Sequence, residues 1–458
     1  MTETVVAEPG HPDDSPHRLQ RPTSWYGRRR ARNLHPLAER CMLMTASTSK
    51  CPVHESYNPF VAPQLDDPFG IWAEARHERP VFYSSLLDAY VITRYSDIVS
   101  VLKQPRVYGS VASRKMFGKA CPEADRILAE LPAMEETNPL SSDAPVHTKI
   151  RRYLQAAFLP RRVAVLEPTL TATADEVIDT FVERGRGDFY SDFAFRYPLL
   201  VVGRLVGIPD SDLDKVKDWA GQRVDLRNSD LDEQTQIAAA KAQREYYEYT
   251  LQLVADRRAQ PGQDLLSWII QDSDASDDPL TEDQLASQAT SLLTAGHETT
   301  AHWLVVAVRR LLQERGRWDA LVADPASLSM KAVEEGLRVD GPVQAIWRKV
   351  KQDVEIGGVS IPAGARLSLV LGSANDDETV FPDPRTFDDS RANVTQHLTF
   401  GRGPHTCVGA PIARLEARIA LMALARRLPR LRLAADDELM FKPNATQRMA
   451  QRLLVEWD

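Results

Sequence analysis

The sequence lacks the features that define several classes of protein. No run of eighteen or more apolar residues occurs, so we expect no membrane-spanning helix. Only four of the 458 residues are cysteine, and Cys41, Cys51, Cys121 and Cys407 are too scattered for a disulfide framework, which favours reduced thiols in a cytoplasmic protein. Basic side chains do not outnumber acidic ones. The 56 basic and 64 acidic side chains give a net charge of −8, which argues against nucleic acid as a partner.

The chain has enough apolar material to form a folded core, because 43% of its residues are hydrophobic. Length alone would allow about three domains. Residues 1–55 differ from the rest, since they combine Pro, Ser, His and Asp with an arginine run and show little periodicity, so we expect a flexible N-terminal extension. No repeat or low-complexity linker divides residues 56–458, which are expected to form a single domain.

Helical periodicity dominates this domain. It predicts helices over residues 163–183, 235–258, 281–314 and 412–428. Strand signals are confined to residues 81–83, 90–93, 354–361 and 366–370. Residues 106–145 are weakly patterned and are expected to form a long loop. The predicted fold class is therefore mainly α with small β-sheets.

One cysteine has distinctive surroundings. Cys407 lies just before a predicted helix whose first turn contains Pro411, so the positive end of the helix dipole would stabilise a thiolate there. Gly403 and Gly409 flank it and would let a flat, large group approach the backbone. Such a thiol could be a nucleophile with His405 as its base, a redox thiol, a metal ligand or a buried structural residue. The glycines favour axial ligation of haem iron.

The loop also carries a family resemblance. Its pattern, Phe400-x-x-Gly403-x-x-x-Cys407-x-Gly409, resembles the haem-binding loop of the cytochrome P-450 family, and in particular its soluble bacterial members. The resemblance implies the cytochrome P-450 fold, a single large domain around a buried haem. It implies haem b as the cofactor, with Cys407 as the axial thiolate ligand and with Phe400 and Gly409 beside the ring.

The predicted helix over residues 281–314 has an unusual middle. It should begin with a capping box of Thr281 and Gln284, yet its centre reads Ala-Gly-His-Glu-Thr-Thr from Ala295, a poor sequence for a helix. One interpretation is a helix bend with hydroxyls bonded back to carbonyls. The run also resembles the oxygen-activation motif of the same family. That resemblance implies that small residues at Ala295 admit dioxygen and substrate, that Thr299 holds a water molecule, and that Glu298 admits protons.

Further positions take their roles from the resemblance alone. Glu335 and Arg338, three residues apart, resemble the family's structural Glu-x-x-Arg pair. The propionates of the haem would be bound by a set of cationic and imidazole side chains: His147, Arg151, Arg348 and His405. The substrate pocket would be lined by the segment that precedes Arg348: Val343, Gln344, Ala345 and Ile346.

Together these features predict a haem-thiolate monooxygenase that hydroxylates or oxidatively dealkylates a small hydrophobic molecule with O2. The alternatives are a peroxide-using or oxidative-coupling haem-thiolate enzyme, or a non-catalytic haem sensor or carrier. We find no flavin or iron–sulfur motif, so we expect electrons from a separate ferredoxin and its reductase, and we expect a monomer. An acidic partner could dock on basic residues near the ligand loop: Lys149, Arg152, Arg402, Arg414 and Arg418.

Overall fold

The structure, a computed structural model, describes residues 57–111, 120–228 and 231–458. The predicted N-terminal extension, with Cys41 and Cys51, therefore lies outside the described residues. The helices of the described ranges are α2 (Phe69–Glu78), α3 (Tyr95–Leu102), α4 (Pro122–Leu128), α5 (Met134–Thr137), α6 (Val146–Ala157), α7 (Pro160–Ala164), α8 (Glu167–Asp179), α9 (Arg196–Val206), α10 (Leu213–Asn228), α11 (Glu233–Ala259), α12 (Leu265–Asp274), α13 (Glu282–Gln313), α14 (Arg315–Ala323), α15 (Pro325–Asp340), α16 (Leu371–Asn375) and α17 (Ala410–Arg427). Short 3₁₀ turns are η1 (Val182–Arg184), η3 (Asp210–Asp212), η4 (Val394–Gln396) and η5 (Gly403–His405), and η2 (Tyr190–Ala194) is a π-helical turn.

The strands form small sheets. They are β1 (Val81–Ser84), β2 (Ala89–Ile92), β3 (Tyr108–Gly109), β4 (Arg186–Asp188), β5 (Ile346–Val350), β6 (Val354–Ile356), β7 (Val359–Ile361), β8 (Arg366–Leu369), β9 (Arg432–Leu433), β10 (Phe441–Lys442), β11 (Met449–Ala450) and β12 (Leu454–Glu456). The largest sheet has the order β1-β2-β8-β5-β3, in which only the β2–β8 pair is parallel. The other sheets are β4-β12-β9, β6-β7 and β10-β11. The predicted mainly α fold with small sheets is confirmed.

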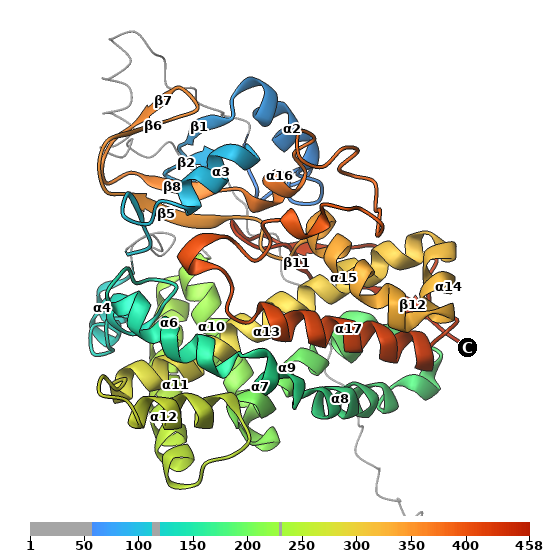
Figure 1. Ribbon diagram of the computed structural model, residues 1–458, viewed down its shortest axis with the longest axis horizontal. Coiled ribbons are helices and arrows are strands. Elements are labelled where there is room, and N and C mark those ends of the chain that lie inside the picture. Colours follow the sequence, from blue (N-terminus) through green and yellow to red (C-terminus); the bar gives the residue numbers. More distant parts are fainter. Residues whose placement is uncertain (1–56, 112–119, 229–230) are drawn as a thin grey trace, which may run out of the picture.

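The two kinds of structure occupy different parts of the molecule (Figure 1). The five-stranded sheet lies with α2, α3 and α16 at the top of the view, and the long helices fill the rest. Helix α17 crosses the front with α8 below it and α15 above it, and it packs against both, while α13 passes behind it. The segment that leads into α17 lies between the two parts. This segment carries Cys407.

The elements differ from the expectation in several places. The predicted strand segment 354–361 is a hairpin of β6 and β7, and β4, β5 and β9–β12 lie outside the predicted strand segments. The helix predicted over residues 163–183 is divided, because α7 ends at Ala164 and α8 begins at Glu167 with Pro168 in its first turn, where a proline costs no hydrogen bond. The predicted loop over residues 106–145 contains β3, α4 and α5 in its described part. These elements are too short to show a clear period in the sequence.

Helix α13 is the central helix, about 48 Å long at 1.5 Å per residue. The predicted capping box is present: the Thr281 hydroxyl accepts from the Gln284 N–H at 3.1 Å, and Oε1 of Gln284 accepts from the Thr281 N–H at 3.1 Å. The helix packs closely against α9, because a Cβ at Gly296 would lie 3.0 Å from Cγ2 of Val202. Gly296 therefore serves helix packing rather than access to the motif.

Two buried histidines anchor α13 to its neighbours. Nε2 of His297 lies 3.0 Å from the carbonyl oxygen of Phe195, directly after η2, and Nδ1 of His302 lies 3.0 Å from that of Ala450 in β11. Burial lowers the pKa of His297 to about 3 and that of His302 to about 4, so both imidazoles are neutral near pH 7. The helix is thus fixed on either side of residues 298–301.

Candidate functional site

The loop before α17 is closed by its own backbone. The Cys407 N–H donates to the carbonyl oxygen of Phe400 at 2.8 Å, and the Gly401 N–H donates to that of Leu398 at 2.7 Å. Helix α17 then begins at Ala410, with Pro411 in its first turn as predicted. We call residues 400–409 the cysteine loop.

Gly403 and Gly409 have different structural roles in this loop. Gly403 has φ of +79°, and a Cβ there would collide with the backbone oxygen of Leu102 at the end of α3. Around Gly409, by contrast, the nearest atoms to an added Cβ would be Cε1 of Phe158 at 3.8 Å and Sγ of Cys407 at 3.9 Å. Gly403 therefore shapes the loop and seats it on α3. Only Gly409 leaves space beside the sulfur.

Opposing effects act on the Cys407 thiol. Burial raises its pKa and outweighs the backbone N–H groups of Gly409 and Ala410 and the guanidiniums of Arg151 and Arg414, which lower that pKa. The start of α17 thus favours the thiolate, as predicted, but its effect is smaller than that of burial. A bound metal cation would keep the sulfur in the thiolate form, since coordination deprotonates a thiol.

His405 is not placed as a base for this thiol. Its Nε2 lies 3.3 Å from Oγ of Ser110, and its ring centroid lies 4.0 Å from that of His147 in α6. Burial, together with Arg348 and His147, lowers the pKa of His405 to about 3. No hydrogen bond joins His405 to Cys407 within the described chain, so the nucleophile interpretation loses its base.

The predicted anion-binding side chains are brought together beside the loop. Burial lowers the pKa of His147, and the positive charges of Arg151 and Arg348 lower it further. Arg151, one turn along α6, donates Nη2 to the carbonyl oxygen of Thr406, while Arg348 extends from β5. Three segments distant in sequence, α6, β5 and the cysteine loop, thus present two guanidiniums and two imidazoles to one region.

Acidic groups do not neutralise this cluster fully. Asp143 is the carboxylate that acts on both imidazoles, but its oxygens also accept from the Ser110 N–H at 2.8 Å and from Nζ of Lys351 at 2.7 Å. Nε2 of His147 and Nε of Arg151 are buried and have no hydrogen-bond partner among the described residues. The donor set therefore fits a ligand with carboxylate groups.

The motif in α13 has one exposed small residue and a hydroxyl bonded back to the helix. Ala295 is exposed, although Leu293 and His297 around it are buried. The Thr299 hydroxyl donates to the carbonyl oxygen of Ala295 at 2.7 Å. This is the back-bonded geometry of the structural interpretation, and it leaves the lone pairs of the hydroxyl oxygen available to accept.

Glu298 is the titratable group of this motif. Burial raises its pKa to about 7; the charge of Lys442 in β10 lowers it, and that of Asp225 in α10 raises it. Lys442 and Asp225 form an ion pair with a 2.6 Å contact, and both side chains are partly exposed. A carboxyl group that titrates near neutral pH can both give and take protons.

The predicted structural pair is fully buried. Arg338 donates Nη2 and Nε to the two carboxylate oxygens of Glu335 at 2.7 and 2.8 Å, and Nη1 to the carbonyl oxygen of Asn375 at 3.0 Å. Oε1 of Glu335 also accepts from the Asp388 N–H at 2.9 Å. The pair joins α15 to the segments around Asn375 and Asp388, which supports a structural role.

The four predicted pocket residues differ in how far they are exposed. Ala345 and Gln344 are buried, whereas Val343 and Ile346 are partly exposed. The Gln344 amide donates to the carbonyl oxygen of Gly341 and lies against Gly372 of α16. The apolar pair Val343 and Ile346 is therefore better placed to meet a ligand.

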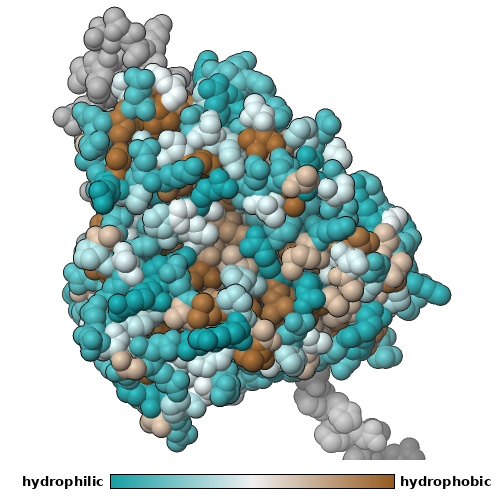
Figure 2. All heavy atoms as spheres, viewed as in Figure 1, coloured by the Kyte–Doolittle hydropathy of each residue, from teal (hydrophilic) through white to brown (hydrophobic). Residues whose placement is uncertain are grey.

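The basic residues near the loop are mostly paired. Nζ of Lys149 lies 2.6 Å from Asp278, and Arg152 lies 4.0 Å from the same carboxylate. On α17, Arg414 pairs with Glu334 and Arg418 with Glu167. Arg402 has no ion pair among the residues that the structure describes. Figure 2 shows a few apolar side chains in the middle of this face, surrounded by hydrophilic ones.

Several residues around the site had no role in the sequence prediction. Lys442, Asp225 and Ser110 come from segments far from the motifs they meet, and no local pattern marks them. Glu334 and His397 could have been suspected, because both directly adjoin predicted motifs.

Comparison with known proteins identifies the family. The sequence pattern of the family "Cytochrome P450" matches residues 328–445. Cytochrome P450 107B1 of Saccharopolyspora erythraea is 36% identical over 377 residues, which cover 81% of this chain and 89% of that protein. This chain belongs to the cytochrome P450 family. The P450 monooxygenase PikC of Streptomyces venezuelae is 35% identical over 85% of this P450 and 91% of its own length.

Comparison with solved structures gives the same family. The structure of an intact type IV self-sufficient cytochrome P450 monooxygenase superposes with a TM-score of 0.84 at 34% identity, over 90% of this P450. The match covers 54% of that longer chain, so this P450 spans about half of it.

Family membership establishes the class of chemistry. The protein is a haem-thiolate monooxygenase, an oxidoreductase whose family binds haem through a cysteine thiolate and acts on small molecules with O2 and redox partners. The predicted family, fold and enzyme class are confirmed. None of the helices in the described ranges has the length and apolar character needed to cross a bilayer.

Proposed function

We propose that Cys407 is the axial ligand of haem b and that this P450 hydroxylates or dealkylates a small hydrophobic substrate. The observation that carries the proposal is the gathering of His147, Arg151, Arg348 and His405 beside the cysteine loop, with two buried nitrogens left unpartnered. Two propionates would match these donors in charge and in hydrogen-bonding capacity. Thiolate-ligated haem supplies the cleavage of dioxygen and the transfer of one oxygen atom to the substrate.

The residues of α13 would then supply protons. Glu298, with its pKa of about 7, exchanges protons with the partly exposed side of the molecule, where Lys442 and Asp225 lie. Thr299 accepts a hydrogen bond at its hydroxyl oxygen while donating to Ala295, and so orients a water molecule. Ala295 keeps this stretch of helix accessible, and Val343 with Ile346 favours apolar substrates.

Electrons would come from a separate ferredoxin and its reductase. A partner that docks beside the cysteine loop would lie close to Cys407. Arg402 on this loop has no ion pair among the described residues. Because the other named cations are paired, we expect electrostatic steering to be modest. Arg402→Glu should slow reduction by ferredoxin, whereas Arg152→Glu, on α6 beside Asp278, should do so less.

The remaining assignments follow from the same geometry. The proposed site needs no residue beyond those already named, which is consistent with the expected monomer. The described cysteines Cys121 and Cys407 are free thiols, which supports a reducing, cytoplasmic location.

The reduced, carbon-monoxide-bound absorption spectrum tests the central assignment. We expect the red-shifted band of thiolate ligation in the wild-type protein and in Cys121→Ala, the matched control, and its loss in Cys407→Ala. Survival of the band in Cys407→Ala would refute the ligand. A screen of apolar ligands for spectral shifts would then narrow the substrate class.

A further inference from the structure

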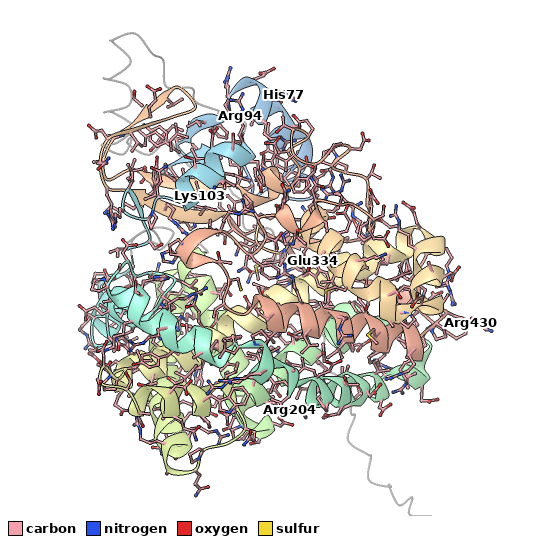
Figure 3. All side chains as sticks on the ribbon, viewed as in Figure 1. His77, Arg94, Lys103, Arg204, Glu334 and Arg430 are labelled. Atoms are coloured by element: carbon pink, nitrogen blue, oxygen red, sulfur yellow. The ribbon has the colours of Figure 1, made fainter. Side chains whose placement is uncertain are left out.

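A buried carboxylate lies at the outer edge of the cysteine loop. Glu334 is the residue before the structural Glu335 on α15, and its side chain is 9% exposed. Its Oε1 accepts from Nε of Arg414, its Oε2 accepts from Nη2 of Arg414 at 3.0 Å, and Nε2 of His397 lies 3.2 Å from Oε2. In Figure 3, Glu334 lies in the middle of the view, where α15 approaches α17.

This carboxylate is charged at any working pH. Burial would raise its pKa, but the hydrogen bonds and charges of His397 and Arg414 hold that pKa at about 2. His397 is itself buried, with 1% of its side chain exposed. Glu334 and its two partners thus form a fixed unit, in which a bidentate guanidinium pair sets the geometry.

Arg414 and His397 of this unit both contact the Phe400 ring. The guanidinium carbon of Arg414 lies 4.4 Å from the centroid of the Phe400 ring, and the His397 ring lies 5.8 Å from it. The carbonyl oxygen of Phe400 accepts the Cys407 N–H at 2.8 Å. One residue therefore separates this ion-paired unit from the ligand cysteine.

The charge of the unit also reaches the sulfur. Arg414 is one of the two guanidiniums that favour the thiolate form of Cys407. A bidentate carboxylate on Arg414 offsets part of that positive charge. Loss of the carboxylate would leave the charge of the guanidinium, whose side chain is 30% exposed, without this counter-charge.

We propose that Glu334 is a positioning residue for the haem ligand: through Arg414 and His397 it holds Phe400, the first residue of the cysteine loop, in place and sets the electrostatic field at Cys407. The inference rests on the proposed ligation of haem by Cys407. Its role differs from that of Glu335, whose oxygens bind Arg338 and the Asp388 N–H.

The sign of the effect follows from charge. Reduction of the haem adds an electron, so a negative charge nearby opposes reduction and a positive charge favours it. Glu334→Gln removes the carboxylate and keeps the shape, and it should move the reduction potential to a more positive value. Arg414→Gln should move it to a more negative value. Glu334→Asp keeps the charge and should restore the wild-type potential.

The measurement is a spectroelectrochemical titration of the holoenzyme. Glu167→Gln is the matched control, because Glu167 pairs with Arg418, one turn further along α17, at 2.6 Å on the surface. We expect no shift there. An unchanged potential in Glu334→Gln, an equal shift in Glu167→Gln, or shifts of the same sign in Glu334→Gln and Arg414→Gln would overturn the proposal.

Two features keep this test separate from the proposed function. Loss of the thiolate band from the wild-type carbon-monoxide spectrum would refute ligation by Cys407, whereas a normal band with unshifted variants would refute only the role of Glu334. If Glu334→Gln does not retain haem, the reduction potentials of Arg414→Gln and Arg414→Lys test the proposal instead. Arg414→Gln should have a lower potential than the wild-type protein, and Arg414→Lys should have a potential near the wild-type value because the charge is kept.

Discussion

The rings of His147 and His405 lie 4.0 Å apart, one on α6 and the other on the cysteine loop. Both imidazoles are neutral near pH 7, because burial and the neighbouring arginines disfavour their charged forms. The contact fixes the loop against the helix that carries Arg151. The carboxylate-binding donors are thereby set in place by contacts within the protein.

This arrangement predicts that Arg151 controls retention of haem. Arg151→Gln removes a partly buried cation whose Nε has no partner among the described residues, so it should weaken haem binding by about 1.5–3 kcal/mol, roughly ten- to a hundredfold. Haem transfer to apomyoglobin measures the loss rate. The neighbouring Arg152→Gln is the control, since Arg152 is largely exposed beside Asp278 and should leave the rate unchanged.

Proton delivery through Glu298 should depend on pH near neutrality. Its pKa of about 7 means that the acid form prevails below pH 7, so coupled product formation should fall as pH rises through that value. Glu298→Gln should lower coupled turnover about a hundredfold and remove the inflection. Product formed per O2 consumed, measured from pH 6 to 8.5, reports both. A wild-type inflection that persists in Glu298→Gln would exclude Glu298 as the titrating group.

The charges beside Glu298 should move that inflection in opposite directions. Asp225 raises the pKa of Glu298, so Asp225→Asn should move the midpoint to lower pH. Lys442 lowers it, so Lys442→Gln should move the midpoint to higher pH. The two variants break the same ion pair. Equal shifts in both would show that the pair acts through structure rather than charge.

Glu416 should make stability depend on pH. It is buried in α17, Oε1 has no hydrogen-bond partner within the described chain, and burial raises its pKa well above the usual value. The folded state therefore holds a proton that the unfolded state releases above its ordinary pKa, and stability falls as pH rises between the two values. Glu416→Gln should flatten this slope and raise the urea midpoint at pH 7.5. A steeper slope in the variant would contradict the account.

Gly403 and Gly358, two of the glycines with positive φ, offer a matched pair that tests how the cysteine loop is held. Gly403→Ala places a Cβ at φ of +79° and against the backbone of Leu102, and should destabilise the protein by about 3 kcal/mol or more. Gly358→Ala, at φ of +78°, meets no atom within 4 Å and should cost only about 1–2 kcal/mol. The difference in unfolding free energy isolates the contact with α3. Equal losses of unfolding free energy in the two variants would mean that the loop moves away from Leu102 and relieves the contact.

Much of the site could be predicted because its motifs are local. The capping box of Thr281 and Gln284, the helix after Cys407 and the Glu335–Arg338 pair each occupy a few consecutive residues, and the structure shows all three. Short elements such as α4 and α5 escaped, because four to seven residues cannot display a helical period.

Contacts between distant segments could not be predicted in the same way. Nothing in the sequence around Glu298 points to Lys442 or Asp225, although both act on its pKa. The role of a glycine is equally hard to predict from sequence: the loop pattern predicts that Gly403 lets a large group approach the backbone, and the structure shows that it contacts the end of α3 instead. Burial, which determines these effects, is a property of the assembled fold.

The seating of Gly403 on Leu102 also bears on the order of folding. The proposed haem-binding side chains come from α6, β5 and the cysteine loop, and the loop takes its shape only against α3. Because contacts between segments far apart in the sequence tend to form slowly, we expect these to form late in folding. We therefore expect haem to bind a chain that is already largely native, so that haem supply during expression governs the yield of loaded enzyme rather than the yield of folded chain.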